Sequence, residues 1–192
     1  MTPSYIAGAF HRHTPLRSSD LVDLVGREAS AFRIYKQTKA VPAGEIVWLT
    51  PGRFEFAAWA SDLDRGQGAE RALLFLVRNE AGEAVDIAAW QPATGRTATW
   101  LGQAWALGQD TIYLARMHED DVLPIRRDVL AWLEAGQRGL VLLDHRRAAL
   151  RLADAGPLEA EDWQHRHELL KALTRPTPRI LIGNTRNEGR AA

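Results

Sequence analysis

Acidic side chains gather after two apolar segments of this 192-residue chain. Glu119 and Asp120 follow the apolar run at 111–115, and Asp144 follows the run at 139–143. Carboxylates are the protein ligands that Mg²⁺ takes, with water and substrate completing its shell. The three carboxylates therefore form a candidate Mg²⁺ site, and a bound Mg²⁺ would suit phosphoryl transfer or phosphodiester cleavage.

Side chains that suit phosphate groups lie near these acids and after a third apolar run, at 179–183. A guanidinium can bind two phosphate oxygens at once, which makes arginine a preferred phosphate contact. If the three apolar runs are parallel strands, their carboxyl ends meet at one edge, where open α/β sheets bind ligands. The candidate phosphate contacts at that edge are Arg146, Arg147, Asn184 and Arg186.

A second interpretation of these charges needs no ligand. Asp144 directly precedes a predicted helix, where an aspartate caps the free N–H groups of the first turn. Asp120 and Asp121 precede a helix that Pro124 is predicted to open, and the helix dipole and turn preferences favour acidic residues there. The two arginines after Asp144 would then lie on a solvated helix face. We favour this interpretation, which makes the charges a helix entrance rather than a catalytic centre.

Two His-Arg-His triplets offer nitrogen ligands for a metal. His11 and His13 would point to one side of an extended N-terminal arm. His165 and His167 lie about 200° apart around a helix and cannot bind the same ion. We expect His167 to be a packed core residue, because it falls on the apolar stripe of its helix. No HExxH or comparable spacing is present, so we expect no transition metal, and Mg²⁺ is the one cofactor that the sequence leaves open.

The chain holds seven tryptophans, a high count for its length. Trp90, Trp100 and Trp105 fall in and after a predicted set of short strands. An exposed aromatic surface could stack nucleic-acid bases or hold a peptide. We favour packing in the core or in a dimer interface, because tryptophan is mostly buried in folded proteins.

Short apolar segments separated by turn residues predict an antiparallel meander over the first half of the chain. The second half alternates between predicted helices and buried strands, which favours parallel pairing. The predicted fold class is therefore α/β, with mixed α+β character: an antiparallel β-meander followed by a small three-stranded, mostly parallel β/α section. The predicted strands of the meander are 73–79, 83–91 and 96–102, and two further strands, 45–50 and 53–60, are predicted before it. The predicted helices are 20–31, 124–135, 145–155 and 158–174. The predicted organisation is an extended N-terminal arm at 1–18, a single domain at 19–184 and a flexible tail at 185–192.

The charge balance of the chain limits its function. Lys+Arg and Asp+Glu are 24 each, so the net charge is zero, and a strongly basic nucleic-acid binder is excluded while a local basic patch is not. The absence of cysteine excludes disulfides, thiol nucleophiles and cysteine-ligated metals. No apolar run approaches the roughly 18 residues that span a bilayer, and the N-terminus lacks the pattern of a signal peptide. We expect a cytoplasmic protein without a membrane partner.

The stretch 72–155 resembles the toprim domain of bacterial and phage-type primases. In those domains a hairpin and a short segment with threonine and glycine lead into a strand that ends in a catalytic Glu-Gly, and an Asp-x-Asp follows a later strand. The corresponding hairpin and segment here read NEAGEAVDIAAWQPATGRTATWLGQAWALG. Arg116-Met117 stands in place of Glu-Gly, and Asp144-His145-Arg146 retains only the first acid of Asp-x-Asp. The resemblance implies a bacterial relative that has lost catalysis, encoded with mobile elements.

Three hypotheses of function follow. The first, which we favour, is a non-catalytic α/β module that assists nucleic-acid processing or docks to a protein partner. The second is a Mg²⁺-dependent phosphoesterase or nuclease that uses Glu119, Asp120 and Asp144. The third is a homo-oligomeric scaffold whose tryptophans form the interface.

Overall fold

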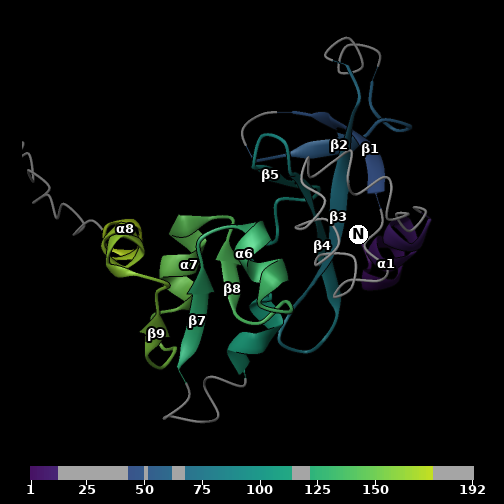
Figure 1. The fold of residues 1–192 in the computed structure, drawn as a ribbon. Helices are drawn as coiled ribbons and strands as arrows, with labels where there is room; N and C mark the ends of the chain where they lie inside the picture. The colour runs from purple at the N-terminus through teal and green to yellow at the C-terminus, as the bar shows by residue number, and fades with distance from the viewer. Residues whose placement is uncertain (13–42, 50–51, 62–67, 114–121, 175–192) are drawn as a thin grey trace, which may run out of the picture.

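Two β-sheets that share a core form the framework of the described chain (Figure 1). The computed structural model describes residues 1–12, 43–49, 52–61, 68–113 and 122–174. The fold is mixed α/β, as predicted: an antiparallel sheet is followed along the chain by a mostly parallel sheet with short helices. Within these residues, no helix combines the length and the apolar character needed to cross a membrane.

The first sheet is antiparallel as predicted, with strand order β2-β1-β3-β4-β5, and its strands β3, β4 and β5 form the predicted meander. It is curled, and β3 and β4 are its longest strands. The predicted strand at 53–60 is shorter than expected, because the chain turns directly after Phe56. The bounds are β1 Ala43–Trp48, β2 Phe54–Phe56, β3 Glu70–Arg78, β4 Ala84–Gln91 and β5 Arg96–Thr99.

The second sheet has the order β6-β8-β7-β9. Strands β7, β8 and β9 run parallel, and β6 pairs antiparallel with β8 at the edge next to the first sheet. The mostly parallel section is thus confirmed, with an antiparallel fourth strand added. The bounds are β6 Ala106–Leu107, β7 Leu123–Arg126, β8 Leu140–Leu142 and β9 Leu158–Glu159.

The strands of this sheet are not all the predicted ones. The run at 139–143 is confirmed as β8, but the prediction of a strand at 111–115 is wrong for its described residues. Residues Gln109–Thr111 form a 3-10 helix, η1, and the helical turn continues through Tyr113. The Thr111 hydroxyl donates to the Gly108 carbonyl at 2.7 Å, which favours the turn, while Ile112 is fully buried. Ile112 therefore fills the core from a helical turn rather than from a strand. The run at 179–183 lies outside the described residues.

Four α-helices cover the sheets in the described part of the chain: α1 Pro3–His11, α6 Val129–Glu134, α7 His145–Arg151 and α8 Trp163–Leu173. Helix α6 does not open at Pro124, which lies in β7. It begins after Asp128, whose side chain accepts the Ala131 N–H at 2.8 Å. Helix α8 likewise begins after a capping aspartate, Asp162, because Leu158–Glu159 pairs as β9. The predicted helix at 20–31 lies outside the described residues.

The prediction of an extended arm at the N-terminus is wrong for Pro3–His11. Thr2 caps the helix, Pro3 occupies its first turn, and Ile6 and Ala9 are buried against the first sheet. Proline at that position costs no helical hydrogen bond and is preset for the helix. The Thr2-Pro3 pair therefore marks the start of a helix rather than an extended segment.

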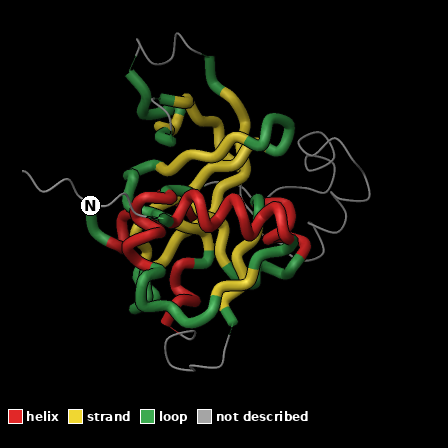
Figure 2. The backbone as a smooth tube through the Cα atoms, turned by 90° about the vertical axis from the view of Figure 1, so that its left-hand side faces the viewer, coloured by secondary structure: helices red, strands yellow, loops and turns green. Residues whose placement is uncertain are grey.

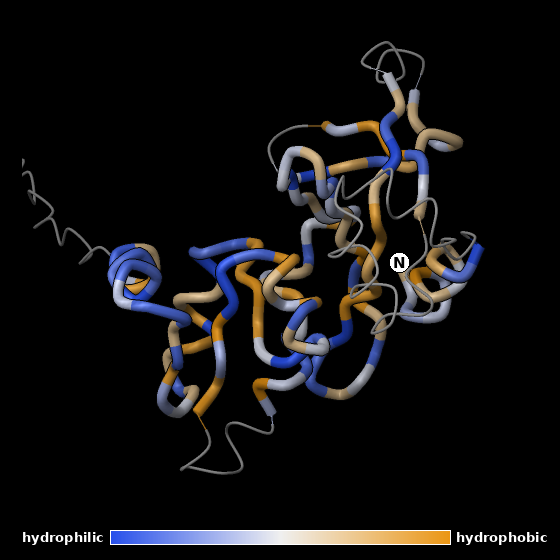
Figure 3. Tube along the Cα trace, in the orientation of Figure 1, coloured by the Kyte–Doolittle hydropathy of each residue, from blue (hydrophilic) through white to orange (hydrophobic). Residues whose placement is uncertain are grey.

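A single hydrophobic cluster joins the two sheets. Phe75 and Trp90 from the first sheet pack with Trp132 of α6 and Val141 of β8, and the Phe75 and Trp132 rings meet edge to face at 5.8 Å. Trp90, Trp100 and Trp105 are all at least 94% buried, which confirms core packing over an exposed stacking surface for these three. Figure 3 shows the hydrophobic stretches running along the strands. Burial of this apolar surface fixes how the sheets sit against each other.

Candidate functional site: a polar cleft between the sheets

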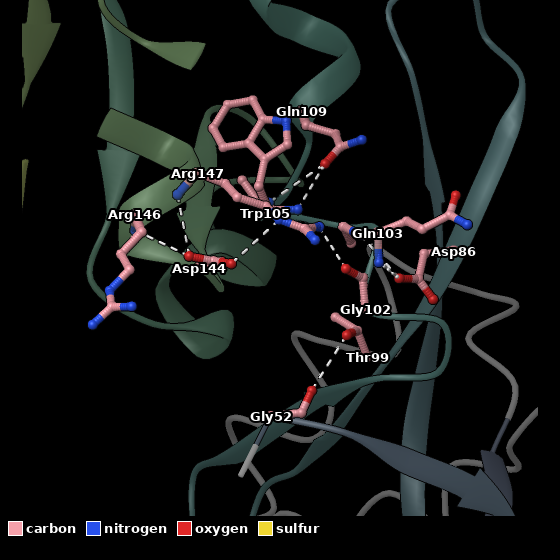
Figure 4. Close-up of polar contacts among 12 residues, drawn as sticks. Gly52, Asp86, Thr99, Gly102, Gln103, Trp105, Gln109, Asp144, Arg146 and Arg147 are labelled. Atoms are coloured by element: carbon pink, nitrogen blue, oxygen red, sulfur yellow. Dashed lines mark hydrogen bonds and ion pairs between the residues drawn. The ribbon is translucent and has the colours of Figure 1, made fainter. Parts of the chain in front are cut away.

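A polar cleft of about 560 Å³ lies between the end of β8 and the turns beside β5 (Figure 4). We call it the inter-sheet cleft. Its lining combines backbone from the first sheet with charged side chains that follow β8, so both halves of the fold contribute. The polar and charged residues that line it are Arg53, Thr97, Thr99, Asp144, His145 and Arg146, together with Gly52 and Gly102.

Asp144 caps helix α7. Its Oδ1 accepts the backbone N–H groups of Arg146 at 3.0 Å and Arg147 at 3.1 Å, and its Oδ2 lies 3.5 Å from Arg147 Nε. Its own N–H donates to the Trp105 carbonyl at 3.0 Å, which fastens the end of β8 to the segment before β6. The capping interpretation is thus confirmed for Asp144. Both carboxylate oxygens already have cationic or N–H partners.

The other predicted ligands lie outside the described residues: Glu119, Asp120, Asn184 and Arg186. Within the described ranges, no group of three His, Asp or Glu side chains is arranged to hold a metal ion. The predicted Mg²⁺ set therefore stays a prediction.

The two arginines after Asp144 have different surroundings. The Arg147 guanidinium donates to the Gly102 carbonyl across the inter-sheet cleft and also faces Asp144 (Figure 4). The exposed Arg146 side chain makes no hydrogen bond or ion pair with the described residues, and Figure 4 shows it directed away from Asp144. Arg147 thus links the sheets, whereas Arg146 is available for a ligand.

The opposite wall of the cleft is held by Arg53 and Thr99. Arg53 donates from Nε, at 3.0 Å, and from Nη2 to the Trp100 carbonyl. The Thr99 N–H and hydroxyl both donate to the Gly52 carbonyl, at 2.9 and 3.3 Å. These bonds order the wall before any ligand arrives and place one positive charge, on Arg53, beside the cleft.

The turn that carries Gly102 depends on Asp86, a residue that sequence reasoning missed. This fully buried carboxylate accepts four backbone N–H groups: Ile87 and Leu101 on Oδ1, both at 2.8 Å, and Gln103 and Ala104 on Oδ2, at 2.6 and 2.9 Å. The signal was present, because Asp86 is the one charged residue within the apolar run AVDIAAW. A buried charge in a strand requires partners, and three of its four partners here are backbone N–H groups of the turn at 101–104.

No protein-family model, curated protein or solved structure matches this chain. What the cleft can do therefore has to be argued from its own geometry.

The carboxyl ends of β7 and β9 hold a second charged group, next to the cap of α8. Arg127 Nη2 pairs with Asp162 Oδ1 at 2.9 Å, and Asp162 also accepts the His165 N–H at 2.8 Å. The His165 N–H, together with the Arg127 guanidinium, holds the pKa of Asp162 below its usual value, and desolvation opposes this effect. These side chains already satisfy one another, so this edge offers a ligand less than the inter-sheet cleft does.

The prediction of a packed histidine in the last helix is wrong in the residue that it names. His165, and not His167, is the packed residue: it is 96% buried, and its Nδ1 accepts the Glu161 N–H at 3.2 Å. The buried face of α8 thus carries a histidine two positions before the predicted one, and the helix begins at Trp163 rather than at 158. His11 is exposed at the end of α1, and His13 lies outside the described residues.

Proposed function

We propose that this chain is a non-catalytic α/β module that binds the phosphates of nucleic acid in the inter-sheet cleft and so assists nucleic-acid processing. One observation carries the proposal. Arg146, His145 and Arg53 border a polar cleft in which the described carboxylate, Asp144, is already neutralised by its cap and by Arg147.

The chemistry of the lining supports a phosphate rather than a cation as the ligand. Arginine suits phosphate oxygens, and the Thr97 hydroxyl and the backbone around Gly102 add neutral polar groups. The net charge of zero gives no general attraction to nucleic acid. Binding therefore depends on this local patch, and it is modest in affinity and sensitive to salt.

The proposed role is also the one that the toprim resemblance implies for a relative without the catalytic acids. This proposal assigns no metal and no bond cleavage to the cleft, because both carboxylate oxygens of Asp144 contact groups of the protein itself. A protein partner and a homo-oligomeric scaffold are the other outcomes that the experiment separates.

The test uses fluorescence anisotropy with a labelled 20-nucleotide single strand and the matching duplex at several salt concentrations. The logarithm of the affinity should fall linearly with the logarithm of the salt concentration. Arg146→Ala should weaken binding several-fold and reduce the magnitude of the salt slope by about 1, as expected for one lost phosphate contact.

Arg138→Ala is the matched control. Arg138 is also exposed, and its substitution removes the same charge. It lies before β8, however, at the end of the strand opposite to Asp144. It should leave affinity and slope within error of the wild type. Binding that does not respond to salt, or that falls equally in both variants, would refute phosphate contacts in the cleft.

A further inference from the structure

Helix α8 lies on the side of the molecule away from the first sheet (Figures 1 and 2). An apolar groove of about 590 Å³ runs along it. Large apolar side chains of the groove are unusually exposed to solvent: Trp163 is 80% exposed and Leu170 is 52% exposed. A contiguous apolar surface of this kind marks a site where another polypeptide segment packs. The apolar residues that line the groove are Leu158, Ala160, Trp163, Leu169, Leu170 and Leu173.

The groove borders an edge of the second sheet. Strand β9 pairs with β7 on one side and is the last strand of that sheet among the described residues. Leu158 of β9 lines the groove, so the groove lies where β9 and α8 meet. A strand added to β9 would gain backbone hydrogen bonds and cover apolar side chains in one step.

The positions of the helices show on which side the next strand belongs. The chain moves from β7 to β8 through α6, and in the opposite direction, from β8 past β7 to β9, through α7. Helix α6 packs in the cluster that faces the first sheet, whereas α7 packs with α8 in a different cluster. Crossovers between parallel strands are right-handed, so each direction of movement places its helix on one particular face. Because α8 shares the face of α7, a parallel strand that followed α8 would have its place beyond β9, away from β7.

We propose that the chain's own segment Arg179–Gly183 occupies this groove as a strand parallel to β9. Its sequence, RILIG, is the apolar run that follows α8, and four residues, RPTP, separate it from Thr174. A helix of 11 residues spans roughly 16 Å, which returns the chain to the starting edge of the sheet. A linker of four or five residues is the usual length for a helix-to-strand connection.

The chain's own segment is favoured over a second copy by its attachment. A segment tethered a few residues away has an effective concentration in the millimolar range. The proposal does not depend on the function of the inter-sheet cleft, since the groove lies at the other side of the second sheet.

The test uses the absence of native cysteine. Leu170→Cys places a single thiol in the groove, and Leu150→Cys places one on α7 at a residue that is 60% exposed and does not line the groove. In the full chain, the thiol at 170 should react with a thiol reagent at least ten-fold more slowly than the thiol at 150. Adding Ile180→Asp and Leu181→Asp, which disrupt both faces of a strand, should restore the rate at 170 and leave the rate at 150 unchanged.

Three outcomes would overturn the proposal. These are equal rates at 170 and 150, protection at 170 that survives the two aspartates, and protection that grows with protein concentration, which would assign the groove to a second copy. Hydrogen exchange of the wild-type chain provides a measurement without substitutions. The amides of 179–183 should be protected, and exchange at the rate of free peptide would contradict the assignment.

Discussion

At the scale of single residues, Asp86 has the largest structural role around the cleft. Its fully buried carboxylate accepts three N–H groups of the turn that connects the two sheets, at residues 101–104, and the N–H of Ile87 in β4. Carboxylates with N–H partners are costly to remove because the donors lose their acceptors inside the protein. The turn at Gly102, and with it the contact from Arg147, depends on this one side chain.

Asp86→Ala should therefore lower the free energy of unfolding by roughly 3–5 kcal/mol. Asp86→Asn retains one oxygen acceptor and should lose less. Chemical denaturation measures both values. Asp154→Ala, at an exposed aspartate, should stay within about 0.5 kcal/mol of the wild type. If Asp86→Ala cost no more than Asp154→Ala, the carboxylate would not hold the turn.

Asp162 predicts a pH dependence of stability. Its pKa is lowered in the folded protein by the His165 N–H and by Arg127, from an ordinary value of 3.8. A lowered pKa stabilises the fold above the unfolded-state pKa, and that stabilisation disappears as the pH falls through the folded-state pKa. Asp162→Asn keeps a capping side chain but removes the charge.

The wild type should consequently have a higher Tm than Asp162→Asn near pH 7. The difference should stay constant down to about pH 5 and shrink below about pH 4. Thermal unfolding followed by circular dichroism across this range measures it. A difference that persisted unchanged in acid would show that the ionised carboxylate is not the cause.

At the scale of elements, the sequence pattern predicted strands better than it predicted where helices begin. Alternation and turn residues identified the meander, because each strand there buries residues against a neighbour in the same sheet. The run at 111–113 was misassigned, since a buried helical turn and a buried strand are equally apolar. The predicted start of α6 was wrong, because Pro124 pairs within β7 and Asp128 caps the helix four residues later.

Close approach of strands at Gly139 is an element-scale feature that no pattern predicts. Gly139 has φ +86°, and a Cβ there would lie 2.3 Å from the Pro124 carbonyl oxygen of β7. Its own carbonyl accepts the Trp132 indole N–H at 3.0 Å, which ties α6 to the entrance of β8. The parallel pairing of β7 with β8 therefore requires a residue without a side chain at this position.

Gly139→Ala should cost about 3 kcal/mol or more of unfolding free energy, because the backbone of β7 cannot move aside. Gly136→Ala provides a matched control, since Gly136 has a similar φ of +69° but open space around its Cβ position. The control should cost only about 1–2 kcal/mol for the left-handed backbone. Equal losses in the two variants, measured in urea, would rule out the steric account.

At the scale of the whole molecule, the general architecture was predictable and the site was predictable in part. The order of a meander and a β/α section follows from local patterns. Local patterns do not show which segments meet between the sheets. Gly52, Thr99 and Gly102 are far from Asp144 in sequence, and their residue types are common ones. Asp144, Arg146 and Arg147 were identified as candidates, but their different roles depend on contacts with Gly102 and Trp105 that only the fold provides.

The central claim is that nucleic-acid phosphates bind in the inter-sheet cleft, and amide NMR spectroscopy with a single-stranded oligonucleotide tests it most directly. During the titration, the largest shift changes should fall at Thr97–Gly102 and His145–Arg147, and they should decrease as salt is added. Saturating oligonucleotide that leaves these amides unmoved, or that moves a different surface alone, would contradict the account.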